Sequence, residues 1–348
     1  MSETTLPVLR HRDYSLDDVQ ADLRDTMAQF FERECPSTVV RDVDPLAFDP
    51  KLWAKVRDVG LLTMSLPESA GGDGAGLVEL VLALEEAGRR IAPVPLVEQV
   101  VALRALVTGG HAVGVDGYLA DRIVTFAPRP QFGDEARLVP NAAVADAVVG
   151  LLDGDLVLVE PDAPAPLADT IGGAPLGWCD LGVPTARTVI ARGAAARAQF
   201  ERARLEWKLA IAAALVGLAR GALNITVQYA NERFAFGVPI GTFQALSYPL
   251  ADVRIAIEGT RRLVWRAAWY LDHEPDVAPM HVAIAYLRAC ETANFAPSQG
   301  IHTQGGFGFT LESDLHLYFR RAKAWPLVAG DPNAELTTIA DLAFGPRA

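Results

Sequence analysis

Residues 230–253 read Ala-Asn-Glu-Arg-Phe-Ala-Phe-Gly-Val-Pro-Ile-Gly-Thr-Phe-Gln-Ala-Leu-Ser-Tyr-Pro-Leu-Ala-Asp-Val and mark the junction between two long helices. One helix is expected to end near Glu232 and the next to begin near Thr242, with Gly237 and Gly241 permitting a tight path between them. The junction carries one cation, two aromatic rings and one amide, namely Arg233, Phe234, Phe236 and Gln244. Such an elbow could bind an anion such as a pyrophosphate, although an ordinary helical hairpin with a surface arginine explains the same spacing.

Three motifs connect this sequence with a known family. Residues 233–244 resemble the Arg-x-x-Phe-Gly-x-Pro-Ile-Gly-x-Phe-Gln signature of the acyl-CoA dehydrogenases. Residues 305–312, Gly-Gly-Phe-Gly-Phe-Thr-Leu-Glu, resemble the C-terminal Gly-Gly-x-Gly-Phe-Thr motif of that family, and the following helix carries the basic residues Arg320, Arg321 and Lys323. Residues 66–74, Leu-Pro-Glu-Ser-Ala-Gly-Gly-Asp-Gly, resemble an N-terminal motif. The order and spacing of the three motifs indicate the family.

The chain is expected to be mostly α-helical with a small central β-domain, and the resemblance implies an acyl-CoA dehydrogenase-like fold. We expect an N-terminal helical domain over residues 1–116, a reduced middle β-domain over 117–192 and a C-terminal four-helix bundle over 193–348. Apolar periodicity and punctuation by Gly and Pro predict helices at 15–33, 49–60, 77–88, 96–107, 194–231, 244–271, 279–295, 314–323 and 334–343. Runs of β-forming residues predict strands at 123–126, 148–152, 156–159 and 188–190.

Local signals support several of these boundaries. Ser15 with Asp18 resembles a capping box for the first helix. Asp49-Pro50 is typical of a helix start, because proline is tolerated in the first turn. Asp153-Gly154 predicts a tight hairpin turn between two strands. The predicted inner face of the first helix consists of Leu16, Val19, Leu23, Met27 and Phe30.

Composition excludes several classes of function. The 348 residues carry a formal net charge of -12, whereas a nucleic-acid-binding surface is normally basic. The three cysteines are far apart and have no metal-ligand spacing, so we expect reduced thiols and no metal site. The first residues, Met-Ser-Glu-Thr-Thr-Leu-Pro, show no signal peptide, and the apolar run 209–219 is shorter than the ~20 residues that span a membrane. A cytoplasmic protein without a membrane segment is expected.

The middle domain departs from the family pattern. Family members carry a Thr-Glu-Pro-x-Ala-Gly-Ser-Asp stretch beside the flavin ring and the thioester. This sequence has no counterpart, since residues 159–163, Val-Glu-Pro-Asp-Ala, share only a Glu-Pro pair and follow the hairpin. The resemblance therefore implies that a cradle for the isoalloxazine ring of this subunit's own FAD is missing or rebuilt.

The resemblance implies FAD as cofactor. Arg233, Phe236 and Gln244 match family residues that reach an FAD bound mainly by a neighbouring subunit. The glycine loop matches the family loop whose backbone approaches the FAD diphosphate, which a side chain would obstruct. His302 and Gln304 stand where the family usually has Gln-x-His. The expected cofactor-binding residues are Arg233, Phe236, Gln244, His302, Gln304, Gly305, Gly306 and Gly308.

No residue is assigned as the catalytic base. The family's reaction removes a proton from the acyl α-carbon, which requires a carboxylate in a dry pocket. Counting without gaps from Arg320, the position of the family's usual glutamate falls on Ala329. Some members of the family place the glutamate on the long helix that leads to the elbow, and there the gap-free match is Trp207. Glu206 and Asp331 are weak candidates. Glu206 is one residue from Trp207 and so points about 100° away around a helix.

The predicted function is therefore that of one subunit of a heteromeric FAD-dependent acyl-CoA dehydrogenase. A longer partner subunit in an α2β2 assembly would supply the base, and this chain would contact FAD across the interface. The family resemblance implies bulky or steroid side-chain acyl-CoA substrates and electron-transfer flavoprotein as the electron acceptor. Two alternatives stay open: a homo-oligomeric acyl-CoA dehydrogenase with a relocated base, and a non-catalytic structural or acyl-CoA-binding partner protein.

Overall fold

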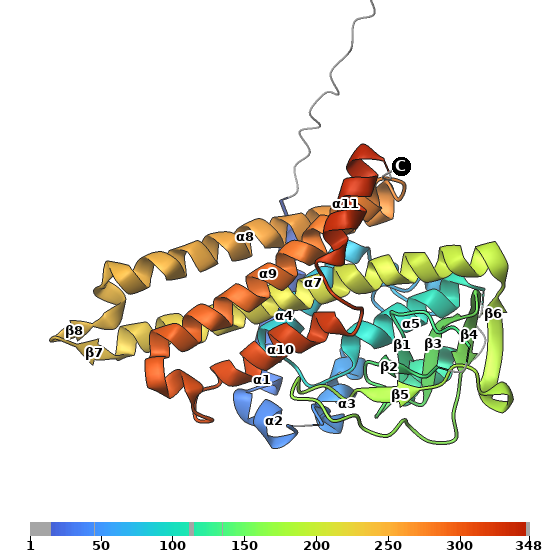
Figure 1. Cartoon of the computed structure of the whole chain (residues 1–348), viewed down its shortest axis with the longest axis horizontal. Helices are drawn as coiled ribbons and strands as arrows, with labels where there is room; N and C mark the ends of the chain where they lie inside the picture. The colour runs from blue at the N-terminus through green and yellow to red at the C-terminus, as the bar shows by residue number, and fades with distance from the viewer. Residues whose placement is uncertain (1–14, 45, 111–114, 134, 346–348) are drawn as a thin grey trace, which may run out of the picture.

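The computed structural model describes residues 15–345 except 45, 111–114 and 134, and within them the chain is mostly helical (Figure 1). The first seven residues, where no signal peptide is expected, lie outside the described residues. Helices precede and follow a group of short strands. The first group comprises α1 (Asp18–Glu34), α2 (Ser37–Asp42), α3 (Pro50–Asp58), α4 (Leu77–Arg89), α5 (Leu96–Thr108) and α6 (Val115–Ala120). The second comprises α7 (Gly193–Glu232), α8 (Gln244–His273), α9 (Ala278–Gln304), α10 (Leu315–Leu327) and α11 (Ala334–Phe344).

The start of α1 differs from the sequence prediction. The N-cap is Asp17, whose Oδ1 accepts a hydrogen bond from Gln20 N at 2.8 Å, while Gln20 Oε1 accepts one from Asp17 N at 3.2 Å. The capping box is thus two residues later than Ser15, and Val19 in the first turn is 76% exposed. The prediction was wrong because Ser15 with Asp18 and Asp17 with Gln20 both have the spacing of a capping box, and the structure uses the second pair.

Within the described residues, the strands between the two groups of helices form one sheet of four and one of two, and two further short strands pair with each other after α7. The larger sheet has the order β1 (Val124–Phe126), β3 (Ala147–Leu152), β4 (Asp155–Val159) and β6 (Arg187–Ala191). β1 runs parallel to β3, and the other pairs are antiparallel. Asp153 and Gly154 form the predicted β3–β4 turn with φ angles of 49° and 89°, as a type I′ turn requires. The smaller sheet pairs β2 (Arg137–Val139) with β5 (Gly177–Cys179), neither of which the sequence predicted.

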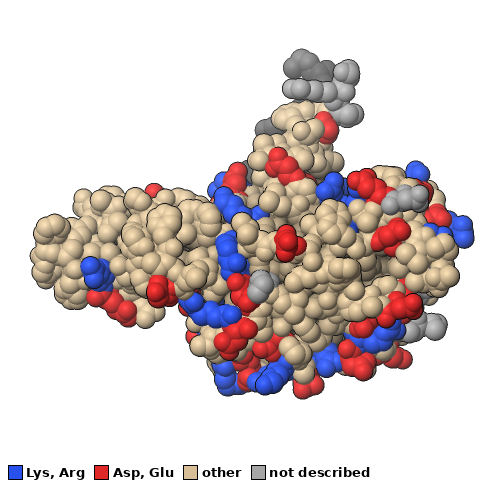
Figure 2. Space-filling view, turned by 60° about the horizontal axis from the view of Figure 1, so that its bottom comes forward, with Lys and Arg blue, Asp and Glu red and all other residues tan. Residues whose placement is uncertain are grey.

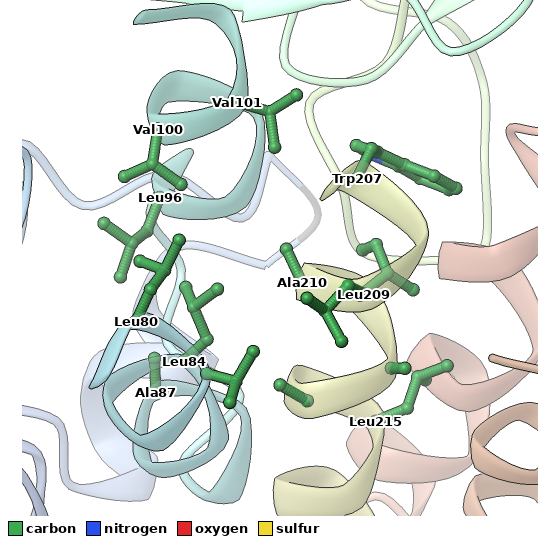
Figure 3. Close-up of a cluster of buried hydrophobic side chains, with 14 of the residues drawn as sticks. Leu80, Leu84, Ala87, Leu96, Val100, Val101, Trp207, Leu209, Ala210 and Leu215 are labelled. Carbon is green, nitrogen blue, oxygen red and sulfur yellow. The ribbon is translucent and has the colours of Figure 1, made fainter. Parts of the chain in front are cut away.

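The long helices α7, α8 and α9 run side by side, and the larger sheet lies at the end opposite to the junction after α7 (Figure 1). α7 has 40 residues, so it is about 60 Å long at 1.5 Å per residue. Its middle packs against α4 and α5, where buried apolar side chains from both sides belong to one core cluster (Figure 3).

Two glycines allow α4 and α7 to cross at short distance. A Cβ atom on Gly217 would collide with the carbonyl oxygen of Glu85 on α4, and a Cβ on Gly88 would collide with the backbone of Ala214 on α7. The crossing therefore requires glycine on both helices. It fixes how the N-terminal helices sit on the C-terminal bundle.

α7 is the one helix, among the residues that the structure describes, with the length and apolarity to cross a membrane. Its most apolar window is 78% buried inside the protein, as expected for the core helix of a bundle. α6 spans the predicted boundary at residue 116, and β6, the last strand of the larger sheet along the chain, ends at Ala191, two residues before α7 begins.

Candidate functional site

The junction after α7 is a two-stranded hairpin rather than an irregular turn. β7 (Phe234–Ala235) pairs with β8 (Val238–Pro239), and the turn residues Phe236 and Gly237 both have positive φ angles, of 53° and 81°. Glycine or asparagine is favoured at such positions, and a residue with a large side chain is strained there by roughly 1 kcal/mol or more.

The side chain at this strained position is also exposed. The Phe236 ring is 97% exposed and packs edge-to-face on Phe243, with 6.2 Å between the ring centroids. Arg233, the C-cap of α7, and Gln244, the first residue of α8, are exposed beside it. A strained backbone conformation at a residue with an exposed side chain is typical of positions that contact a ligand or another subunit.

The glycine loop begins where α9 ends. Gly305 has φ 60° and ψ -135°, a conformation open essentially to glycine. No atom lies within 4 Å of where a Cβ would be on Gly305 or Gly306. The backbone of these two residues is therefore accessible to a bound group. Gly308 differs, because a Cβ there would lie 2.7 Å from Ile301 O, so this glycine serves the packing of the loop on α9.

The two polar residues before the glycines have different environments. His302 is exposed on the last turn of α9. Gln304 is buried, and its Oε1 accepts a hydrogen bond from Ser313 Oγ at 2.5 Å. Gln304 thus holds the loop against the start of α10, whereas the side chain of His302 is available to a ligand.

The structure brings the hairpin and the glycine loop to the same end of the bundle (Figure 1). The ring of Phe307 in the loop stacks on Tyr229, one turn before Arg233, with 5.9 Å between centroids and 8° between planes. Large apolar side chains are exposed on both segments: Phe234, Phe236, Phe307, Phe309 and Leu311. This end of the molecule protrudes from the body and carries few charged residues in the view of Figure 2.

A second candidate site is a cavity of about 90 Å³ in the body of the protein. Its walls come from the end of α4, the start of α5, the middle of α7, helix α10 and residues 173–176. Most lining side chains are apolar. Among the lining residues that the structure describes, the polar exceptions are Glu98, Asn141 and Arg321.

Neither carboxylate considered from the sequence is suited to act as a base. Glu206 is buried, with Oε2 at 2.7 Å from Arg104 Nε and Oε1 at 2.8 Å from Arg202 Nε. Burial alone would raise the pKa of Glu206, but the two guanidinium groups outweigh it and hold the pKa below its usual range. Asp331 is exposed and accepts hydrogen bonds from the backbone and side chain of Asn333. Ala329 is half-buried, next to the cavity-lining Val328.

Sequence reasoning missed the carboxyl group that does line the cavity. Glu98 in the first turn of α5 accepts hydrogen bonds from Trp207 Nε1 at 3.1 Å and from Asn141 Nδ2 at 2.6 Å. Burial raises the pKa of Glu98, because these donors are neutral and do not offset the loss of water. One signal was present: Glu98 is the single acidic residue of a largely apolar helix.

A buried ion pair fixes the last helix. Lys208 Nζ lies 2.6 Å from Glu335 Oε1, which joins α7 to the first turn of α11. Burial lowers the pKa of Lys208, although Glu335 acts in the opposite direction. This pair follows Trp207 along α7, so the segment where some family members place their base is here occupied by an aromatic ring and a paired lysine.

The chain has N-terminal helices, a small sheet and a bundle of long helices, and the hairpin and the glycine loop lie together at the end of the bundle. This is the fold of a flavin-dependent acyl-thioester dehydrogenase. Residues 17–120 match the family model "Acyl-CoA dehydrogenase, N-terminal domain", and residues 193–343 match "Acyl-CoA dehydrogenase, C-terminal domain". The chain belongs to the acyl-CoA dehydrogenase family.

Individual relatives agree with this assignment. The chain is 30% identical to the acyl-CoA dehydrogenase IpdE2 of Mycobacterium tuberculosis, over 86% of this chain and 89% of that protein. It is 28% identical to the acyl-CoA dehydrogenase FadE27 of the same organism, over 94% and 97% of the two chains. Among solved structures, a chain of the ChsE4-ChsE5 complex from M. tuberculosis superposes with a TM-score of 0.82 at 27% identity, covering 97% of this chain and 100% of that one.

Proposed function

We propose that this chain is one subunit of a heteromeric, FAD-dependent acyl-CoA dehydrogenase. It contributes the hairpin and the glycine loop to an FAD held mainly by a partner subunit, and it does not supply the catalytic base. The observation that carries this proposal is Ala329, a residue without a titratable group at the position where the family usually has glutamate.

The fit of the FAD diphosphate to this end of the bundle rests on three features. Arg233 offers an exposed cation. Gly305 and Gly306 offer backbone that a phosphate can approach, since no neighbouring atom crowds them. Phe236 offers an exposed ring on a strained turn. FAD would supply a hydride acceptor for the acyl β-carbon, and Arg233, Gly305 and Gly306 of this chain would hold its diphosphate.

The proton step belongs to the partner in this proposal. A base must lie close to the acyl α-carbon with a pKa raised toward the working pH. Glu206 is tied to two arginines with its pKa lowered, and Asp331 lies in an exposed turn. A longer subunit with the usual glutamate would supply this group. The cytoplasmic location, the bulky or steroid side-chain acyl-CoA substrates and the use of electron-transfer flavoprotein are part of the same proposal.

A heteromer is supported by the exposed apolar end of the bundle and by the relatives. Phe309 and Leu311 are 82% and 74% exposed, and such a patch marks a contact surface. One similar solved structure is that of a complex of two components, ChsE4 and ChsE5. By analogy, the hairpin and loop of this chain would be covered in the assembly.

The test is to purify this chain alone and after co-expression with a longer acyl-CoA dehydrogenase subunit that carries the glutamate. We expect a colourless chain alone and a complex with the visible absorbance of bound FAD that is bleached by acyl-CoA. In the complex, Arg233→Ala should lower FAD affinity by about tenfold, as for a lost charge-assisted contact. The control Arg254→Ala, on an exposed part of α8, should leave FAD affinity unchanged.

Two results would overturn the proposal. A complex that stays colourless would leave a structural or acyl-CoA-binding role for this chain. A yellow chain that is bleached by acyl-CoA without any partner would show a homo-oligomeric enzyme with a relocated base.

Glu98 favours the alternative of a homo-oligomeric enzyme with a relocated base, because this residue is a cavity-lining carboxyl group with a raised pKa. The variant Glu98→Gln separates the two. In a homo-oligomeric enzyme it should abolish the exchange of acyl α-protons with solvent, whereas a base in the partner predicts unchanged exchange in the complex.

A further inference from the structure

Arg41 on α2 connects the N-terminal helices with the end of the glycine loop (residues 305–312), 270 positions further along the chain. All three guanidinium nitrogens of this side chain donate hydrogen bonds there. Nε donates to Asp314 Oδ1 at 2.7 Å, Nη1 to Leu311 O at 2.7 Å and Nη2 to Glu312 O at 3.2 Å. One arginine thus contacts the backbone of the last two loop residues and the N-cap residue of α10.

The beginning of the glycine loop is held by a different contact. Gln304, at the end of α9, accepts a hydrogen bond from Ser313 Oγ at 2.5 Å. In the second half of the loop, Phe309 and Leu311 have exposed side chains. These apolar side chains do not anchor that half of the loop to the body, whereas the backbone contacts with Arg41 do.

The turn after α2 contacts α10 a second time. Asp44 Oδ2 lies 2.6 Å from Arg320 Nη2, and its Oδ1 lies 3.3 Å from Arg321 Nη2. Asp44 therefore holds the middle of α10, while Arg41 holds its start and the loop before it. The side chains of Arg41 and Asp314 are 33% and 25% exposed, so water screens this ion pair less than a pair on the open surface.

We propose that Arg41 is a positioning residue for the FAD diphosphate, because it fixes the glycine loop without taking part in the phosphate contact. The proposal rests on the proposed function, in which this loop contacts an FAD held mainly by the partner subunit. A rigid fork of donors suits the task, since it sets the direction of its acceptors as well as their distance. A loop fixed beforehand also loses less entropy when a ligand binds to it. The N-terminal helices would thereby influence FAD affinity at the far end of the bundle.

Amide hydrogen exchange followed by mass spectrometry on the full chain measures the hold on the loop without FAD. Thr310 N donates to Phe307 O at 3.0 Å inside the loop, so exchange at this amide reports opening of the loop. In Arg41→Gln, we expect exchange in the peptide that covers residues 305–312 to rise about tenfold relative to peptides of α7, as for lost contacts to a charged group. A role in overall stability alone would raise exchange in α7 equally.

Two substitutions serve as controls. Arg33→Gln removes an arginine from an exposed ion pair with Glu34 on α1 and should leave exchange in the loop unchanged. Arg41→Lys keeps a positive charge beside Asp314 but offers one nitrogen where the guanidinium uses three. We expect that lysine does not restore the protection of the loop, because the direction of the donors is lost.

FAD affinity is measured in the co-expressed complex. Arg41→Gln should lower it by about tenfold, although Arg41 does not contact the diphosphate in this proposal. Arg233→Ala should lower FAD affinity as well, but it should leave exchange in the loop unchanged, because Arg233 is the C-cap of α7 and lies outside the loop. A change in both measurements distinguishes a positioning residue from a contact residue.

Unchanged loop exchange in Arg41→Gln would overturn the proposal, and so would unchanged FAD affinity in a yellow complex of this variant. Full restoration of both by Arg41→Lys would show an effect of charge alone and would also overturn it. If Arg41→Gln does not fold, Asp314→Asn removes the charged acceptor and should raise exchange in the same peptide; no rise would contradict the proposal. A wild-type complex without FAD would instead overturn the subunit function, while exchange in the chain alone still decides whether Arg41 holds the loop.

Discussion

Trp207 on α7 donates its indole N–H to Glu98 on α5 across 3.1 Å, although the two residues are 109 positions apart in the chain. The bond connects the core helix of the bundle to the wall of the cavity. It also places a neutral donor, and not a cation, beside a buried carboxyl group. The protonation state of Glu98 therefore depends on burial more than on charge pairing.

The pH dependence of stability should report this carboxyl group. A raised pKa in the folded state means that the folded protein keeps a proton that the unfolded chain releases above its ordinary value of 4.5. The free energy of unfolding contributed by Glu98 then falls as the pH rises from that value through the folded-state pKa. Urea unfolding of the wild type and of Glu98→Gln at several pH values measures this contribution. The variant should gain stability relative to the wild type as pH rises, and a constant difference would contradict the assignment.

Glu206 should behave as a structural ion-pair partner. Glu206→Gln leaves Arg104 and Arg202 without their carboxylate in a largely buried place, which should lower the free energy of unfolding by on the order of 3 kcal/mol. The matched control Glu201→Gln removes an exposed partner of Arg204 and should change it by less than about 1 kcal/mol. Equal effects of the two substitutions in urea unfolding would show that the buried network does not stabilise the fold.

The helix crossing gives a second pair of matched substitutions. Gly217→Ala drives a methyl group into the backbone of α4 and should destabilise by about 1–3 kcal/mol, because the helices must separate. Gly259→Ala on α8 meets no atom within 4 Å and should stabilise by about 0.5–1 kcal/mol through helix propensity. Thermal unfolding of both variants compares the signs. A stabilising effect at position 217 would mean that the close crossing is wrong.

Phe236 should show opposite effects on stability and on assembly. Asparagine adopts a positive φ more readily, so Phe236→Asn should stabilise the isolated chain by roughly 1 kcal/mol. The same change removes an exposed ring, and it should therefore reduce FAD retention or subunit association in the complex. Chemical unfolding of the chain alone and FAD release from the complex are the two measurements. Loss of stability without any change in the complex would show that the ring serves only the hairpin.

Much of the fold followed from local sequence signals. The ends of α4, α5, α7 and α8 were predicted within about two residues, and so was the β3–β4 turn. The prediction failed where local signals were short or ambiguous. β2 and β5 have three residues each, too few for a pattern, and they are strands because they pair with each other. α9 continues past the predicted end near residue 295 to Gln304, because its packing against α7 and α10 supports the last turns.

From the sequence by itself, the resemblance of the motifs indicated the family, and caps, glycines and apolar periodicity determined the helical plan, because these signals act over a few neighbouring positions. Tertiary structure alone decided which titratable groups are buried and what they face. Glu98 meets Trp207, Glu206 meets Arg104 and Arg321 enters the cavity wall because helices distant in the chain pack together. A pKa or a binding site depends on those contacts and on the exclusion of water, neither of which a local pattern contains.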